Sequence, residues 1–295
     1  MPGRQPDRAL FVDVNRTRLR VWQWGDAAAP VVIMVHGAFD HGRMFDGIAP
    51  RIAELGFHVN AVDMRGHGDS ARLWSGNTWL AMNLDLAMLA RHLGAPVRFV
   101  SHSMGGGQSL CAASAFPELV RWVVTIDGLG PPRVAFEARD PATSASEAFT
   151  AIERVWDQGP RQYPSREDMA ARRQRINVRM SDEWAQHLVV HGSRPGRDGG
   201  FEWKFDPVFN TGVPGPFSPD LLLAQFRLLQ CPVLLLTGSE PDTWNDLTPD
   251  ERDERLATIP DSRHHEIADA GHYVHLEQPD PVMDHLRAFI DEVGA

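Results

Sequence analysis

The feature that most limits how this chain can fold is an alternation of short apolar runs with helix-like segments. The run VVIMV at residues 31–35 contains no polar residue, which is typical of a strand buried on both faces of a sheet. Strands that alternate with helices predict the α/β class: a mostly parallel, twisted sheet with helices on both faces. Such sheets bind ligands outside the carboxyl ends of their strands, so we expect the chemistry there. Further strands are predicted within residues 57–63, 97–100, 122–127, 231–242 and 265–272, and helices near 44–54, 78–93 and 281–292, with another ending near 115.

Two local patterns in the first third of the chain add detail. Residues 11–24 alternate apolar and polar side chains around Asn15-Arg16, which predicts a β-hairpin that turns at this pair. In the helical segment that follows Thr78, three apolar residues with i, i+4, i+8 spacing share one face: Leu80, Leu84 and Met88.

The alternation stops after the strand that ends near residue 127. We therefore predict a core domain of residues 1–130 and 230–295, interrupted by a helical cap, or lid, of residues 131–229. An insertion this long is unusual for a simple connection between a strand and a helix. Ser165 and Ser181 are suitable N-caps for two of its helices. The helices of the cap are predicted near 144–157, 165–178 and 182–190, and one more with Pro219 at its first position.

Composition excludes several classes of partner. The net charge of −10, from 39 acidic and 29 basic residues, argues against binding to nucleic acid or to an anionic membrane surface. No apolar segment is long enough to span a membrane, and the amino terminus lacks the apolar stretch of a signal peptide, so a cytoplasmic protein is expected. Cys111 and Cys231 are too few for a disulfide framework, and we predict that both are buried as small apolar residues.

The stretch VSHSMGGG at residues 100–107 raises the question of a nucleophile. Ser103 follows a predicted strand and precedes a predicted helix, with the small residues Ser101 and Gly105 two positions to either side. Small flanking residues let a strand turn sharply into a helix and expose the central side chain, as in the G-x-S-x-G elbow, here with serine for the first glycine. A serine hydroxyl reacts at neutral pH only with a histidine to accept its proton, a carboxylate to orient that histidine, and donors for the oxyanion.

Four separated motifs give the chain a resemblance to a known family. VVIMVHGAFDHG, DMRGHGDS, SHSMGG and DAGHYVHLEQP occur in the order found in capped serine hydrolases of the α/β-hydrolase superfamily, and together they extend over nearly the whole chain. The resemblance implies the chain order nucleophile, acid, histidine. Ser103 would be the nucleophile, and His272, which follows the last predicted strand, would be the general base.

The carboxylate of the triad has three candidates. Asp242 follows the strand that contains VLLLTG and is the predicted acid. Asp127 ends the strand before the insertion, a position that some members of the family use instead, and Glu240 lies two residues before Asp242. Asp127 and Glu240 therefore remain as alternatives.

The resemblance also implies an oxyanion hole and a substrate pocket. The backbone N–H of Met104 would provide one donor, from the start of a helix, where the helix dipole favours negative charge. The N–H of Ala38, or that of Phe39, would provide the other, and His36 would brace this loop by hydrogen bonding. We identify no H-x-x-x-H or H-E-x-x-H spacing among the histidines, so we expect neither a metal ion nor another cofactor. The residues predicted to line the pocket are Phe39, His102, Trp203, Phe205 and Trp244.

These features predict acyl transfer, in which Ser103 attacks a carbonyl and water then hydrolyses the acyl-enzyme. Capped relatives that act on halides or epoxides use an aspartate in place of Ser103, and the HGGPG signature of proline iminopeptidases is absent, since the loop here reads HGAFD. The expected partner is therefore a small to medium carboxylic ester, thioester or lactone. Two alternatives remain: a receptor or binding protein that keeps the triad but turns over slowly, and a cofactor-free haloperoxidase or perhydrolase.

Overall fold

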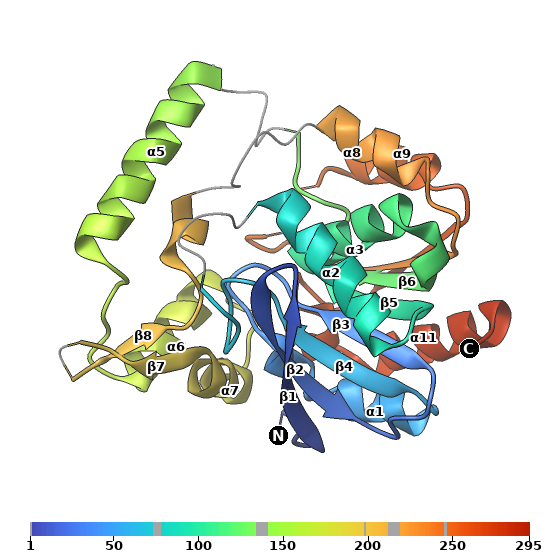
Figure 1. Ribbon diagram of the computed structural model, residues 1–295, viewed down its shortest axis with the longest axis horizontal. Coiled ribbons are helices and arrows are strands. Elements are labelled where there is room, and N and C mark those ends of the chain that lie inside the picture. Colours follow the sequence, from blue (N-terminus) through green and yellow to red (C-terminus); the bar gives the residue numbers. More distant parts are fainter. Residues whose placement is uncertain (1, 73–77, 134–140, 198, 212–218, 245–246) are drawn as a thin grey trace.

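The computed structural model describes residues 2–72, 78–133, 141–197, 199–211, 219–244 and 247–295, and an eight-stranded sheet runs through it (Figure 1). The strand order is β1-β2-β4-β3-β5-β6-β9-β10. β2 pairs antiparallel with β1 and with β4, and all pairs from β4 to β10 are parallel. The predicted α/β class with a mostly parallel sheet is therefore confirmed. The strands are β1 (Arg8–Val14), β2 (Thr17–Trp24), β3 (Val31–Val35), β4 (His58–Asp63), β5 (Val97–His102), β6 (Val120–Ile126), β9 (Val233–Gly238) and β10 (Ser262–Ile267).

Helices cover both faces of the sheet, because successive side chains of a strand point to opposite sides. In β3, Met34 belongs to one apolar cluster, and Ile33 to the other. The Met34 side packs against α1 (Ala49–Glu54), α10 (Val274–Glu277) and α11 (Pro279–Val293). The Ile33 side packs against α2 (Trp79–Leu93), α3 (Met104–Ala115), α8 (Pro219–Phe226) and α9 (Pro249–Thr258). The described residues also form three short 3₁₀ turns: η1 (Gly42–Phe45), η2 (Pro117–Leu119) and η3 (Pro207–Thr211).

The predicted amino-terminal hairpin is present as β1 and β2. Its turn residues, Asn15 and Arg16, have φ angles of 44° and 55°. Positive φ at both central residues is the geometry of a two-residue hairpin turn whose twist matches that of the strands. Arginine seldom adopts this conformation, and the pairing of Val14 with Thr17 fixes it here.

The apolar face inferred for α2 is not its buried face. Leu80, Leu84 and Met88 do share a face, but Leu80 is 77% exposed, and the helix buries Met82 and Leu86 instead. Apolar residues lie almost all round this helix, so the i, i+4 spacing fits more than one face. The buried ion pair between Arg65 and Asp85 of α2 also lies on the core side of the helix.

The segment between β6 and α8 contains the predicted helices, as α5 (Pro141–Gln158), α6 (Arg166–Ile176) and α7 (Asp182–Gly192). Ser165 and Ser181 cap α6 and α7, as predicted, by accepting hydrogen bonds from the N–H groups of Asp168 and Trp184. The same segment contains an unexpected two-stranded sheet of β7 (Ser193–Pro195) and β8 (Phe201–Trp203), whose strands are only three residues long. These elements lie together at one side of the large sheet (Figure 1).

Two further features of the fold concern membrane-spanning helices and the cysteines. Within the described ranges, no helix has the length and apolar character needed to cross a membrane. Cys111 and Cys231 are both buried free thiols, as predicted, and burial raises the pKa of each to about 12.

Candidate functional site

Ser103 occupies a sharp turn between β5 and α3. Its φ of 52° and ψ of −121° are unusual for a residue with a side chain and are typical of strain held at functional sites. The hydrogen bond from the Ser103 N–H to the carbonyl of Ile126, 3.0 Å long, fixes the turn to the end of β6. A Cβ atom on Gly105 would lie 2.3 Å from the carbonyl oxygen of Val35, so the start of α3 can approach β3 only with glycine at this position.

The other serine of the motif has a different environment. Ser101 lies in β5, is fully buried, and its Oγ is 2.6 Å from Oγ of Ser109 in α3. Its hydroxyl therefore joins the strand to the helix beneath the turn. Ser101 therefore takes the structural role of the first glycine in the G-x-S-x-G motif. Ser103 remains the candidate nucleophile.

His272 and Asp127 form the central contact of the site. The Nδ1–H of His272 donates a 2.6 Å hydrogen bond to Oδ2 of Asp127, and both side chains are almost entirely buried. Asp127 directly follows β6 and has a φ of 47°, and the neighbouring strand β5 leads into Ser103. A proton on Nδ1 leaves Nε2 of the neutral ring as the acceptor, which is the tautomer that a general base requires.

The structure gives His272 a different carboxylate from the one preferred on the sequence. In the described part of the chain, no hydrogen bond joins its ring to Asp242 or to Glu240. Oδ1 of Asp242 accepts from the backbone N–H of Trp244, and Oε1 of Glu240 accepts from Ser239. Asp242 lies near the turn at Gly271. The carboxylate hydrogen-bonded to the imidazole of His272 is nevertheless that of the alternative, Asp127, which directly follows β6, and not that of the preferred candidate, Asp242.

The loop after β3 is held in place by His36. Its Nδ1–H donates to the carbonyl of Gly37 at 2.7 Å, and its Nε2 accepts from the N–H of Met64 at 2.9 Å. Burial lowers the pKa of His36, which keeps the ring neutral and able to make both contacts. The loop then passes through Phe39 at a φ of 67°. A Cβ on Gly37 would lie 3.0 Å from Cβ of Ser103, so the loop that contains Ala38 packs directly against the candidate nucleophile.

Met104, the other predicted oxyanion donor, is the first residue of α3. The N–H of the first residue of a helix has no partner within that helix. The N–H groups of Gly106 and Gly107 both donate to the carbonyl of Ser103, at 2.9 and 3.4 Å, so the backbone turns tightly at this end of α3.

His102 contacts His272 but is buried rather than pocket-facing. Its Nε2–H donates to the carbonyl oxygen of His272 at 3.0 Å, and the two rings are 4.6 Å apart. Only 1% of His102 is exposed, and burial lowers its pKa well below the usual value for histidine. The side chain therefore supports the loop of His272, which is a different role from lining a pocket.

The aromatic residues predicted to line the pocket do come together. The rings of Phe39 and Phe205 are 5.2 Å apart, those of Phe39 and Trp244 are 6.1 Å apart, and Trp203 stacks on Phe205 at 5.9 Å. This cluster joins the loop after β3, the segment after β8 and the loop after β9. It provides an apolar surface next to the loop of Ala38.

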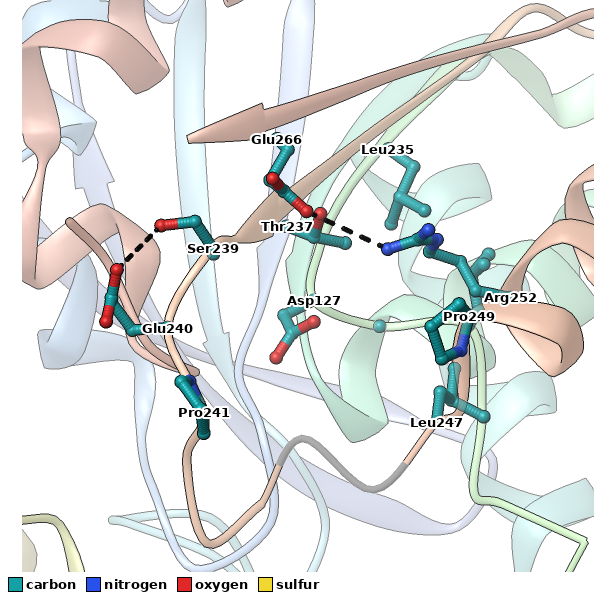
Figure 2. Close-up of a pocket in the computed structure, with 13 residues that line it drawn as sticks. Asp127, Leu235, Thr237, Ser239, Glu240, Pro241, Leu247, Pro249, Arg252 and Glu266 are labelled. Atoms are coloured by element: carbon teal, nitrogen blue, oxygen red, sulfur yellow. Dashed lines mark hydrogen bonds and ion pairs between the residues drawn. The ribbon is translucent and has the colours of Figure 1, made fainter. Parts of the chain in front are cut away.

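A cavity of about 240 Å³ is lined in part by Asp127, the candidate acid. Figure 2 shows Asp127 between the loop at Ser239–Pro241 and the start of α9 at Pro249. Neither Ser103 nor His272 lines this cavity, so it differs from the place where an ester would meet the nucleophile.

The prediction that no histidines have H-x-x-x-H spacing is wrong. His187 and His191 have H-x-x-x-H spacing in α7, and with Asp46 they place ligand-type atoms within 4.8 Å of one another. The guanidinium of Arg43 already occupies this place: it donates from Nε and Nη2 to Asp46 at 2.9 and 2.6 Å and lies 3.4 Å from His191. Arg43 thus provides the positive charge that a metal ion would otherwise supply.

Comparisons with known proteins identify the family and the fold. A family model described as the alpha/beta hydrolase fold matches residues 30–279. Esterase YbfF of Escherichia coli is 28% identical over 266 residues, which cover 88% of this chain and 93% of that protein. Esterase Rv0045c of Mycobacterium tuberculosis is 26% identical over 271 residues, 91% of this chain and 85% of that protein. A solved structure of Rv0045c covers 98% of this chain and 93% of its own, with 25% identity and a TM-score of 0.77. The thioesterase domain from the curacin biosynthetic pathway has a TM-score of 0.83 at 19% identity, covering 95% of this chain and 99% of that domain, which shows the fold alone.

Proposed function

Because the chain belongs to the α/β-hydrolase family and is a carboxylesterase-like hydrolase, we propose that it cleaves a small to medium carboxylic ester, thioester or lactone through an acyl-enzyme on Ser103. The observation that carries this proposal is the hydrogen bond between His272 and Asp127, because Asp127 directly follows Ile126, whose carbonyl accepts the N–H of Ser103. A histidine oriented by a carboxylate is the general base that an activated serine nucleophile requires.

The proposed reaction has two halves. In the first, Nε2 of His272 takes the proton of the Ser103 hydroxyl as Oγ attacks the carbonyl carbon, and the imidazolium then protonates the departing alcohol or thiol. In the second, His272 takes a proton from water as the water oxygen attacks the acyl carbon. The imidazolium then returns this proton to Oγ of Ser103 as the bond between Oγ and the acyl carbon breaks, which releases the carboxylic acid and restores the serine hydroxyl. Asp127 stabilises the imidazolium in both halves, because its carboxylate accepts the Nδ1–H. The N–H groups of Ala38 and Met104 stabilise the oxyanion, and no cofactor takes part.

We assign substrate selection to Trp203 and Phe205 of the proposed cap, residues 131–229. This segment contributes Trp203 and Phe205 to the aromatic cluster with Phe39 of the core. The loop of residues 37–40, which contains Ala38, is called the oxyanion loop below. An apolar lining beside this loop favours an apolar acyl or alcohol group over a charged one.

The test is a panel of p-nitrophenyl esters, acyl thioesters and lactones assayed with wild-type protein and with Ser103→Ala. Turnover of at least one class by the wild type, reduced at least about 100-fold in Ser103→Ala, is the expected result. Tight binding of such compounds without turnover would instead support the receptor alternative. Peroxide-dependent bromination faster than ester hydrolysis would support the haloperoxidase alternative.

A further inference from the structure

A buried arginine of the cap segment contacts two loops of the candidate site. Arg173 lies in α6 and is 8% exposed. Its Nη2 donates to Oδ1 of Asp40, and it also donates to the hydroxyl oxygen of Tyr273 at 3.0 Å. The Tyr273 O–H in turn donates to Oδ2 of Asp40 at 3.1 Å. The three side chains form a closed set of hydrogen bonds, which we call the Asp40–Arg173–Tyr273 triangle.

All three side chains of the triangle are buried, so water competes little for their hydrogen bonds. Asp40 is 2% exposed and Tyr273 is 6% exposed. Burial raises the pKa of the Asp40 carboxyl, and the charge of Arg173 and the hydrogen bond from Tyr273 oppose this shift. A buried carboxylate that lost its cation would be strongly destabilised, because its remaining surroundings cannot replace hydration.

Asp40 connects the triangle to the oxyanion loop. It follows Phe39, whose φ of 67° is costly for a residue with a side chain, and the N–H of Asp40 reaches the carbonyl of Gly37 at 3.4 Å. The loop therefore needs an anchor after Phe39 to keep this shape. The side chain of Asp40, fixed on both oxygens, is that anchor, two residues from the N–H of Ala38.

Tyr273 connects the triangle to the general base, because it is the next residue after His272. Its hydroxyl is fixed by Asp40 and Arg173, so a displacement of the tyrosine would displace the backbone of the histidine. The oxyanion loop and the histidine loop come from distant parts of the chain, and one guanidinium from α6 holds both.

We propose that Arg173 is a positioning residue: through Asp40 and Tyr273 it sets the oxyanion donors and His272 in register, so that the site is complete only when α6 is seated on the core. This inference rests on the proposed serine hydrolase function. Arg173 has no separate task of binding a substrate anion, because Asp40 already neutralises its charge and shares Nη2 with Tyr273.

Three variants test the proposal. Tyr273→Phe removes one hydroxyl and keeps the ring, so it tests the triangle with little risk to folding. Arg173→Gln removes the charge and tests the whole connection. Arg133→Gln is the matched control, because Arg133 makes an exposed ion pair with Glu254 at 2.9 Å, away from Asp40 and Tyr273.

The measurements are kcat and KM on the best ester, together with the affinity for an alkylboronic acid, which forms a tetrahedral adduct with the serine that mimics the oxyanion. We expect Tyr273→Phe to lower kcat about 3- to 10-fold and Arg173→Gln about 100-fold, with KM changed less than about twofold. Boronate affinity should fall in parallel with kcat, while Arg133→Gln leaves both values at the wild-type level. A loss of stability alone would leave kcat per folded molecule unchanged, so thermal unfolding is recorded for each variant.

Two results would overturn the positioning role. One is an unchanged kcat and boronate affinity in both triangle variants. The other is a rise in KM, with constant kcat, that is confined to anionic esters and would make Arg173 a substrate-binding residue. Failure of the proposed function is a separate result, since then the wild type itself would hydrolyse no ester faster than Ser103→Ala, and the positioning role would fall with it.

Discussion

Oδ2 of Asp127 lies 2.6 Å from Nδ1 of His272, although the two residues are 145 positions apart in the chain. The contact joins the end of β6 to the loop after β10. It orients the ring and selects the tautomer whose free nitrogen can accept a proton. The proposed chemistry depends on this contact more than on any other.

The first prediction concerns the choice of carboxylate. Asp127→Asn keeps the shape of the side chain but removes its charge and gives Nδ1 of His272 a neutral partner, so kcat should fall by about 10³- to 10⁴-fold. Asp242→Asn is the matched control, because Asp242 makes its hydrogen bond with Trp244, and kcat should stay within about threefold of wild type. Steady-state kinetics of the two variants decide the assignment. A large loss in Asp242→Asn with little loss in Asp127→Asn would restore the sequence-based choice.

The second prediction concerns backbone strain at the nucleophile. Glycine adopts the φ of 52° found at Ser103 without a steric penalty, so Ser103→Gly should raise the free energy of unfolding by about 1 kcal/mol relative to Ser103→Ala. Both variants lack the nucleophile, so the comparison isolates the backbone. Urea unfolding measures the difference. Equal stability of the two variants would mean that the turn stores no strain.

The third prediction concerns the approach of α3 to β3. Gly105→Ala would place a Cβ 2.3 Å from the carbonyl oxygen of Val35, so the helix must move, at a cost of about 1–3 kcal/mol in stability and with a loss of kcat. Gly107→Ala is the control on the same helix, since its Cβ would lie 3.1 Å from the edge of the Trp79 ring and 3.4 Å from the Cα of Gly130, which are much looser contacts. Thermal unfolding and ester hydrolysis are measured together. The account predicts a severe effect at Gly105 and a mild one at Gly107, and the reverse order would contradict it.

The fourth prediction concerns acid stability. Burial lowers the pKa of His275 to about 3, from the ordinary value of 6.5, and both ring nitrogens are buried without a hydrogen-bond partner. Below pH 6.5 the unfolded chain gains a proton that the folded chain does not accept, so this group reduces stability progressively as the pH falls and has no such effect above pH 6.5. The reduction should reach about 2 kcal/mol at pH 5.

His275→Leu should remove this contribution. The stability of the variant relative to wild type should therefore be greater at pH 5 than at pH 7.5, by about 2 kcal/mol. Urea unfolding of both proteins at the two pH values measures the quantity. A stability difference that does not change with pH would show that His275 gains its proton normally in the folded state.

The sheet and its helices could be predicted from sequence because their signals are local. Uninterrupted runs such as 31–35 and cap residues such as Ser165 and Ser181 depend only on nearby residues, and each appears where it was expected. The buried face of α2 could not be assigned, because the helix is apolar on most sides. The strands β7 and β8 escaped prediction because three residues are too few to establish a period.

The sequence predicts the site only to the extent that its residues follow the ends of predicted strands. Ser103, His272 and several carboxylates all follow strands, but strands β6 and β9 both end near acidic residues, and only the three-dimensional arrangement selects Asp127. The Asp40–Arg173–Tyr273 triangle gave no signal at all. Its members are separated by 133 and 100 positions, and no motif connects a helix of the insertion to the two loops.

The measurement that tests the central claim most directly is the mass of the protein during the reaction. A p-nitrophenyl ester is mixed with the wild type, quenched in acid within milliseconds, and digested for mass spectrometry. The account predicts one acyl group per chain, on Ser103, that disappears as substrate is consumed and that never forms in Ser103→Ala. Continued turnover with no acyl group on the protein, or with the acyl group on Ser101, would contradict it.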